Sequence, residues 1–410
     1  MPASLVYEGS GHAKSLHEQV MDAAISQKAG SKSSTRSRRP PFERIALVLQ
    51  GGGALGAYQG GVYQALSEAN LHPDWVSGIS IGAINSAIIA GNPPEGRVDK
   101  LRRFWELVSQ SPLGVPPLPI ELNEFTHNMV NQARALGILF FGAPNFFLPR
   151  FPSPFLVPQL NAESLSFYDV SPVRPTLERL VDFELLNDGP TRLSVGTVNV
   201  RSGNFLYFDT ATHRVGLDHI LASGALPPGF PPVKIEGEYY WDGGLLSNTP
   251  LDWVLDCPDR ADTLTFQVDL WSARGDLPRD LIEADLRQKE IRFSSRTRLS
   301  SDRFHKVQCL RRAMWQLLKE LPPNLRQKQE TEFLAKEADD KVYNIIHLIY
   351  HAQNYEGSSK DYEFSRRTME EHWAAGYYDT VRTLRHPEVL ERPRSLDGVF
   401  TFDIARDGRF

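Results

Sequence analysis

The most constraining feature of the sequence is an apolar run at Ile45–Leu49 that leads, after Gln50, into three consecutive glycines at Gly51–Gly53. A continuous apolar run of this length is typical of a strand buried on both faces of a parallel sheet. Apolar residues then recur at helical spacing, at Tyr58, Val62, Ala65, Leu66 and Ala69. A short strand expected at 74–77 is likewise followed by a helical pattern from Ile81. This alternation predicts parallel βαβ units and an α/β fold.

The bulk properties argue against several classes of protein. The 410-residue chain has a net charge of -5 and an isoelectric point of about 6.1, so we expect no nucleic-acid partner. Its two cysteines, Cys257 and Cys309, are far apart and fit neither a disulfide framework nor a metal site. Residues 1–20 lack the apolar core of a signal peptide, and no apolar run reaches the roughly 18 residues of a membrane span. We therefore expect a cytoplasmic protein that lies, at most, peripherally on the inner membrane face.

Composition divides the chain into three parts. Residues 1–43 include a Ser-rich basic stretch and are expected to form a disordered tail, because such a segment buries too little apolar surface. Residues 44–271 carry the α/β pattern. Within them, the segment 110–160 is rich in proline and phenylalanine, which indicates a cap over a site or a surface that meets lipid, with an ordinary packed insertion as the alternative. Residues 272–410 are expected to form a mostly helical region that packs on the preceding domain.

A serine flanked by glycines marks the first candidate site. The segment Gly78–Gly82 reads GISIG, follows the second expected strand and opens an apolar helix. This is the setting of a nucleophile elbow, in which a sharp turn between strand and helix exposes the serine hydroxyl. The helix that begins at Ile81 directs free N–H groups toward the site. Ser80 is therefore a candidate nucleophile.

The glycine-rich loop after the first strand offers two interpretations. Its backbone N–H groups, unobstructed by side chains, can stabilise an oxyanion at the carboxyl edge of the sheet, where α/β sites form. Gly51-x-Gly53-x-x-Gly56, with Asp74 further on, also matches a dinucleotide-binding fingerprint. In that fingerprint the acid stands at the end of the second strand, whereas Asp74 stands at its start, and a dinucleotide site gives no role to Ser80. The oxyanion interpretation is therefore favoured.

The residue that takes the serine proton is not adjacent in sequence. Asp242 follows an aromatic strand and precedes Gly243 and Gly244, so its carboxylate is expected at an open strand end, where it can take the serine proton if it lies within hydrogen-bond reach. Taken alone, the same residues also fit an Asp-Gly turn. An aspartate of ordinary pKa is a weak base at neutral pH, but burial raises the pKa of a carboxyl. The alternative base is a later histidine such as His347, in the order Ser80, Asp242, histidine.

Three motifs in this order resemble those of the patatin-like phospholipase family: Gly51–Gly56, Gly78–Gly82 and Asp242–Gly244. The resemblance covers about 44–271, which would be the catalytic domain, and it implies a three-layer α/β/α sandwich with a mostly parallel central sheet. It also implies lipid acyl-ester hydrolysis by a Ser80–Asp242 dyad without histidine and without a metal or other cofactor. The oxyanion hole would be formed by Gly51, Gly52, Gly53 and the Ile81 N–H. The remaining motif residues would be Gly56, Gly78, Gly82, Gly243 and Gly244.

The resemblance leaves several properties open. Many family members carry Arg or Lys where this chain has Leu55, so recognition of a charged head group does not follow. Residues 272–410 are similar to the extra region of some bacterial patatin-like proteins. An esterase for neutral or short acyl esters, and a lipid-binding scaffold with a vestigial dyad, are the alternatives. The expected partner is a lipid or acyl ester, with peripheral membrane contact, and the oligomeric state stays undetermined.

Overall fold

A computed structural model describes residues 39–111, 124–156, 161–294, 297–352, 356–395 and 397–403. The compact unit begins at Arg39. Most of the tail expected at 1–43 therefore lies outside the described residues, as does part of the proline-rich segment. The strands are β1 Arg44–Leu49, β2 Trp75–Gly78, β3 Leu148–Pro149, β4 Tyr168–Asp169, β5 Arg192–Asn199, β6 Phe205–Asp209, β7 Val233–Ile235, β8 Glu238–Asp242, β9 Thr263–Asp269, β10 Tyr343–Ile349 and β11 Val399–Phe402.

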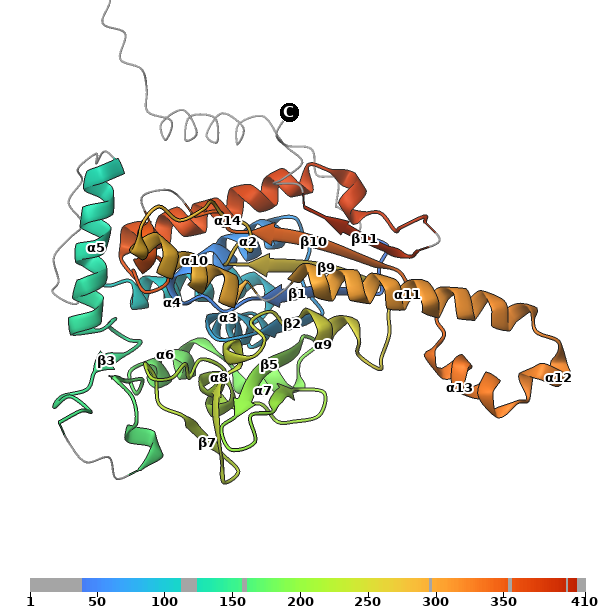
Figure 1. Ribbon diagram of the computed structural model, residues 1–410, viewed down its shortest axis with the longest axis horizontal. Coiled ribbons are helices and arrows are strands. Elements are labelled where there is room, and N and C mark those ends of the chain that lie inside the picture. Colours follow the sequence, from blue (N-terminus) through green and yellow to red (C-terminus); the bar gives the residue numbers. More distant parts are fainter. Residues whose placement is uncertain are drawn as a thin grey trace, which may run out of the picture. The chain divides into compact units, whose positions relative to one another are not determined.

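Helices account for most of the remaining described residues. The α-helices are α2 Ala57–Glu68, α3 Ile81–Ala90, α4 Arg97–Val108, α5 Glu124–Phe141, α6 Val173–Leu180, α7 Phe183–Asp188, α8 Leu217–Ser223, α9 Leu251–Leu255, α10 Leu281–Phe293, α11 Thr297–Glu320, α12 Pro323–Arg326, α13 Gln329–Glu337 and α14 Arg366–Leu384. Short 3-10 helices are η1 Gly53–Gly56, η2 Pro94–Gly96, η3 Ala162–Ser164, η4 Gly243–Leu245, η5 Gly357–Ser359 and η6 Pro387–Leu390. Helices α12 and α13 follow the C-terminal end of α11 and project away from the central sheet (Figure 1).

The central sheet is mostly parallel. Its strand order is β11-β10-β9-β1-β2-β5-β8-β7, and β6 pairs with β5 off this path. The five pairings from β11 to β5 are all parallel, whereas β6, β7 and β8 join by antiparallel pairings. The carboxyl ends of the parallel strands therefore share one edge, which lies toward the left in Figure 1.

Alternate residues of β1 face two different hydrophobic layers. Ile45, Leu47 and Leu49 belong to a buried cluster that includes side chains of α2, α3, α4 and α14. Ala46 and Val48 belong to a second cluster with side chains of α9 and α11. Because successive side chains of a strand point to opposite faces, helices cover both faces of the sheet. This arrangement confirms the predicted α/β/α sandwich.

Composition suggested a boundary between two regions at residue 271, but strands from both sides of this boundary belong to the same sheet. β10 and β11, both from the later part of the chain, extend the sheet beyond β9 through parallel pairings. Helix α14 lies beside α2 (Figure 1), and Gly376 allows the contact because a Cβ there would lie 2.0 Å from the Tyr58 carbonyl oxygen. Residues on both sides of the boundary thus share one core.

The proline-rich segment contains a long helix that its composition conceals. Helix α5 occupies the part of the segment that lacks proline, between Pro119 and Pro144, where nothing prevents helical hydrogen bonding. Phe140 near the end of α5 is exposed, Phe146 and Phe147 after the helix are buried, and Phe151 is exposed again. Across the described ranges, no helix has both the length and the apolar character needed to cross a bilayer.

Candidate active site

Ser80 lies at the turn between β2 and α3. Strand β2 ends at Gly78 and α3 begins at Ile81, so the serine occupies the position just before the first helical turn. Its backbone has φ 57 and ψ -124, which is a sparsely populated conformation for a residue with a side chain. This strained turn between strand and helix is the geometry of a nucleophile elbow.

Two backbone contacts hold this turn in place. The Ser80 N–H donates to Ser223 Oγ at 3.0 Å, and the Ser223 hydroxyl donates to the Gly196 carbonyl oxygen at 2.7 Å. Gly82, in the first turn of α3, packs against β1 so closely that a Cβ there would lie 2.3 Å from the Leu49 carbonyl oxygen. Only glycine permits this approach.

The register of the sheet brings Asp242 level with Ser80. Gly78 pairs with Val195 of β5, and Thr197, two residues further along β5, pairs with Asp242 at the end of β8. Ser80 is two residues beyond Gly78. The side chains of Ser80 and Asp242 therefore lie at the same level along β5, next to Thr197. The separation of 162 positions in sequence is thus removed by one shared neighbouring strand.

Asp242 is buried and interacts directly with the serine. Its carboxyl is 2% exposed, forms a hydrogen bond with the Ser80 hydroxyl and accepts from the Gly244 N–H at 2.7 Å through Oδ1. Burial raises the pKa of Asp242 to about 7, and the two hydrogen bonds only partly oppose this increase. A carboxylate of this pKa is well matched to proton transfer at neutral pH.

The glycine-rich loop lies against the serine. A Cβ on Gly51 would lie 3.0 Å from the Ser80 Cβ. The Gly51 N–H donates to the Asn248 carbonyl oxygen at 3.3 Å. Among the residues that the structure describes, the N–H groups of Gly52, Gly53 and Ile81 have no hydrogen-bond acceptor. Unused N–H groups beside a serine hydroxyl are what an oxyanion hole requires.

Segments far along the chain anchor this loop. Gly53 has φ +56, and a Cβ on it would lie 2.1 Å from the Asp361 carbonyl oxygen, which also accepts from the Ala54 N–H at 2.8 Å. The Gln50 side chain accepts from the Leu270 and Trp271 N–H groups at 2.6 and 2.9 Å. The loop is therefore fixed by the residues just after β9 and by those after η5.

Three side chains that hold the backbone of the candidate active site in place were not identified from the sequence. Asn248 Nδ2 donates to the Gly51 carbonyl oxygen at 2.9 Å. Asn85 Nδ2 donates to the Gly56 carbonyl oxygen at 3.0 Å, and Ser223 holds the Ser80 backbone as described. Asn85 and Asn248 stand close to recognised motifs, in GAIN and DGGLLSN, and this proximity is the signal that could have identified them, whereas Ser223 lies 19 positions before Asp242.

The remaining motif residues lie around the same site. Gly56 ends η1, and Gly243 and Gly244 begin η4 directly after Asp242. Leu55 occupies the position at which many patatin-like proteins carry Arg or Lys, and its side chain is fully buried in the core. Asp74 accepts from the Ile45 N–H at 2.8 Å, at the amino end of β1 and therefore at the opposite edge of the sheet from the glycine-rich loop.

His347, named as an alternative base, lies on β10. Its Nδ1 is 3.7 Å from Asp269 Oδ2, and β9 and β1 separate its strand from β2. In the described part of the chain, the side-chain hydrogen bonds of Asp242 are with Ser80 and Gly244, and no histidine is among these partners.

Comparison with known proteins defines the class to which this fold and site belong. The profile of the family described as "Patatin-like phospholipase" matches residues 47–255, just over half of the 410-residue chain. A second profile, described as "Patatin phospholipase", matches residues 291–396. The chain belongs to the patatin-like phospholipase family, as its three motifs predicted.

The most similar regions of individual relatives are short. The chain is 38% identical over 92 residues to patatin-like phospholipase domain-containing protein 6 of Homo sapiens, a match that covers 22% of this chain and 7% of that protein. It is 44% identical over 68 residues to lysophospholipase nte1 of Aspergillus terreus, covering 16% and 4%. The crystal structure of VipD from Legionella pneumophila aligns with a TM-score of 0.37 and 15% identity, over 93% of this chain and 78% of that one.

Proposed function

We propose that this protein hydrolyses acyl esters of lipids, with Ser80 as nucleophile and Asp242 as general base. The observation that carries the proposal is the interaction of the Ser80 hydroxyl with the buried Asp242 carboxyl, whose pKa burial raises to about 7. An aspartate of this pKa can accept a proton at neutral pH without a histidine as intermediary. Family membership supports the same reaction class.

In the first step, Asp242 removes the hydroxyl proton as Ser80 Oγ attacks the ester carbonyl. A tetrahedral intermediate forms, its carbonyl oxygen becomes an oxyanion, and the alcohol leaves with a proton returned from Asp242. We assign oxyanion stabilisation to the N–H groups of Gly52, Gly53 and Ile81, because the Gly51 N–H already donates to Asn248. Removing one such donor typically costs about 10²–10³ in rate.

In the second step, Asp242 activates a water molecule that attacks the acyl-Ser80 ester. The same N–H groups bind the second oxyanion, and collapse of this intermediate releases the fatty acid and restores the Ser80 hydroxyl. The proton cycle uses only Asp242, so these steps do not require a residue outside the pair.

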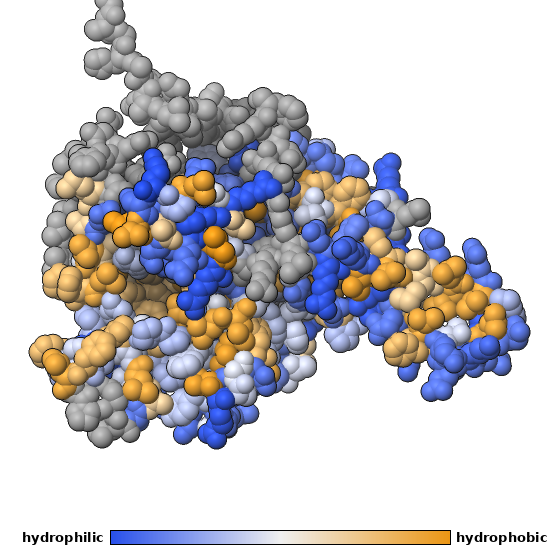
Figure 2. Space-filling view, viewed as in Figure 1, coloured by the Kyte–Doolittle hydropathy of each residue, from blue (hydrophilic) through white to orange (hydrophobic). Residues whose placement is uncertain are grey.

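Exposed apolar side chains support access from a lipid surface. They gather on α5 and the segment after it (Figure 2), at Met129, Leu136, Phe140, Phe141, Leu148, Phe151, Phe155 and Leu156. This surface lies toward the edge of the sheet where β1 and β2 end (Figure 1). We propose that the protein acts at the cytoplasmic face of a membrane, and the name of the Aspergillus relative suggests a lysophospholipid as the first substrate to test.

Substitution of each dyad residue tests the proposal. We expect Ser80→Ala and Asp242→Asn each to lower kcat on p-nitrophenyl butyrate and on lysophosphatidylcholine by on the order of 10³-fold or more, since the two residues act as a unit. A fluorophosphonate probe should label the wild type and leave Ser80→Ala unlabelled. His347→Gln should keep wild-type activity, because His347 pairs with Asp269.

The opposite results are equally informative. Near-full activity of Ser80→Ala or Asp242→Asn would refute the dyad. A loss in His347→Gln as large as that in Ser80→Ala would favour a histidine-assisted triad. Absence of both labelling and hydrolysis in the folded wild type would leave a lipid-binding protein with a vestigial dyad.

A further inference from the structure

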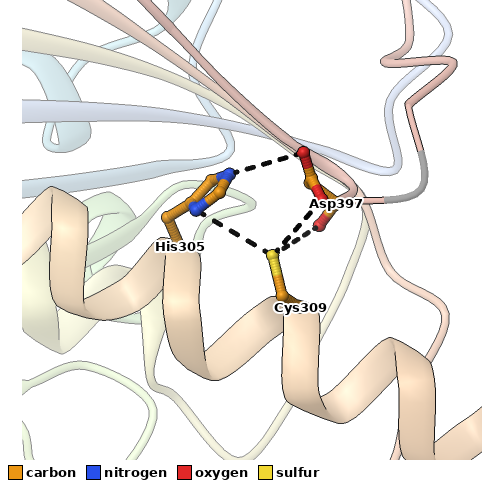
Figure 3. A group of neighbouring side chains, drawn as sticks. All are labelled: His305, Cys309 and Asp397. Carbon is orange, nitrogen blue, oxygen red and sulfur yellow. Dashed lines mark hydrogen bonds and ion pairs between the residues drawn. The ribbon is translucent and has the colours of Figure 1, made fainter.

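A second group of reactive side chains lies outside the candidate active site. His305, Cys309 and Asp397 point toward one another between α11 and the turn before β11 (Figure 3). His305 and Cys309 are one helical turn apart, so they share a face of α11. The same i, i+4 spacing presents two metal ligands on one face of a helix in known zinc sites.

The third side chain is placed by the sheet. Asp397 precedes Gly398, whose φ of +72 turns the chain and whose carbonyl oxygen accepts from the Tyr343 N–H at 2.8 Å. Tyr343 then pairs with Val399 as β11 begins. The carboxylate is thus held over α11 by the first residues of the β10–β11 ladder, 88 positions after Cys309.

One ligand atom from each of the three residues can be chosen so that all three atoms lie within 4.8 Å of one another. Cys309 Sγ is 3.9 Å from His305 Nδ1 and 3.7 Å from Asp397 Oδ1, and His305 Nε2 is 3.9 Å from Asp397 Oδ2. Nitrogen and oxygen atoms this far apart form weak ion pairs at best. Ligand atoms about 2.0 to 2.3 Å from a tetrahedral zinc ion lie roughly 3.3 to 3.6 Å from one another, so small side-chain rotations close the site.

We propose that His305, Cys309 and Asp397 bind one zinc ion, with water as the fourth ligand. Thiolate, imidazole and carboxylate together are a ligand set typical of Zn²⁺. Binding releases the Cys309 thiol proton to solvent, and the thiolate and carboxylate charges then balance the two charges of the ion. His305 and Cys309 are partly exposed, which provides an entry path and room for the water.

The site is structural and separate from ester hydrolysis. Asp397 precedes β11, so it lies at the amino edge of the parallel strands, whereas Ser80 lies beyond their carboxyl edge. A bound ion would instead join α11, which carries the α12–α13 pair, to the edge strand of the sheet.

Cobalt is the probe for this proposal. The reduced full-length chain, stripped of metal with a chelator, is titrated with Co²⁺ and its near-ultraviolet absorption recorded. We expect one Co²⁺ per chain with a thiolate-to-cobalt charge-transfer band, and loss of the band when Zn²⁺ is added. Hydrolysis of p-nitrophenyl butyrate should be the same with and without either ion.

Matched variants identify the ligands. Cys309→Ala should remove the band, and Asp397→Asn should weaken binding at least tenfold, since even changes next to ligands cost about 10–100-fold. Cys257→Ala changes the other, buried cysteine and should keep the band. Absence of the band in the folded wild type, or an equal band in Cys309→Ala, would overturn the proposal.

Discussion

Asp242 illustrates how its surroundings change the chemistry of one residue. The carboxyl has almost no contact with water, and its hydrogen bonds with Ser80 and Gly244 do not fully compensate for lost hydration, so its pKa rises to about 7. In water the same side chain would have a pKa near 3.9 and would be a poor base. The register of β5 with β2 and β8 therefore places the Asp242 carboxyl beside Ser80 and away from water.

The raised pKa predicts a pH dependence of the proposed reaction. Asp242 must be unprotonated to accept the serine proton, so its active fraction grows as the pH rises through about 7. We expect kcat/KM for p-nitrophenyl butyrate to increase about tenfold per pH unit below that value and to level off above it. The measurement is a pH profile from about 5 to 9, corrected for spontaneous hydrolysis.

Asp99→Asn, which changes an exposed carboxyl on α4, is the control and should reproduce the wild-type profile. A profile that stays flat from about pH 5 to 9 would mean that burial does not act on Asp242, because a carboxyl with the ordinary pKa of about 3.9 is unprotonated throughout that range.

At the scale of elements, α5 and the chain after it form an apolar exposed surface toward the carboxyl edge of the sheet (Figure 2). Phe140 is 71% exposed and Phe151 98% exposed. Apolar area of this kind on a protein surface typically marks a binding site. A lipid interface would cover it and would place the substrate beside Ser80.

Vesicle binding tests this role of α5. We expect Phe140→Ser combined with Phe151→Ser to lower partitioning onto phosphatidylcholine vesicles at least tenfold, because burying one such side chain contributes about 1.5–3 kcal/mol and about 1.4 kcal/mol is tenfold. Co-sedimentation measures the bound fraction.

Phe333→Ser is the matched control, since Phe333 is 66% exposed on the projecting α13. It should bind vesicles as the wild type does. Equal losses in this variant and in the α5 variant would mean that the contact is a general effect of surface hydrophobicity.

Elements from the later part of the chain also reach the candidate active site. The carbonyl oxygen of Phe293, the last residue of α10, accepts from Asn248 Nδ2 at 2.9 Å and from Gln50 Nε2 at 3.2 Å. Asp361, just after η5, contacts Gly53 and Ala54. The geometry of the glycine-rich loop thus depends on residues outside the segment 44–271 that carries the motifs.

For the whole molecule, this dependence predicts that the motif-bearing segment does not fold alone. A chain of residues 39–271 lacks β10, β11 and α14, and it exposes Leu264, Phe266 and Val268 of β9, which are buried in the intact protein. Burying one such side chain contributes about 1.5–3 kcal/mol, so the lost burial is comparable with the usual net stability of about 5–15 kcal/mol. We expect no cooperative urea unfolding transition by circular dichroism.

A chain of residues 39–403 is the control, because it keeps every described strand and helix. It should unfold cooperatively at the same urea concentration as the full chain. Cooperative unfolding of the 39–271 chain would show instead that β10, β11 and α14 are dispensable for folding.

The sequence by itself determined the α/β class and the candidate site residues, because both leave local signals. A buried parallel strand requires an apolar run such as Ile45–Leu49, and a strained turn requires glycines around Ser80. The motif order then sufficed to indicate the family. Helix α5 was missed because the prolines on either side dominated the composition of its segment.

Only the tertiary structure decided which distant residues meet. The parallel pairing of β10 with β9 unites the two parts of the chain, and the register across β5 sets Asp242 beside Ser80. The grouping of Cys309 with Asp397 depends on the first pair of the β10–β11 ladder. Contacts between strands and helices far apart in sequence leave no local pattern, because they arise from burial of the shared core and not from the preferences of neighbouring residues.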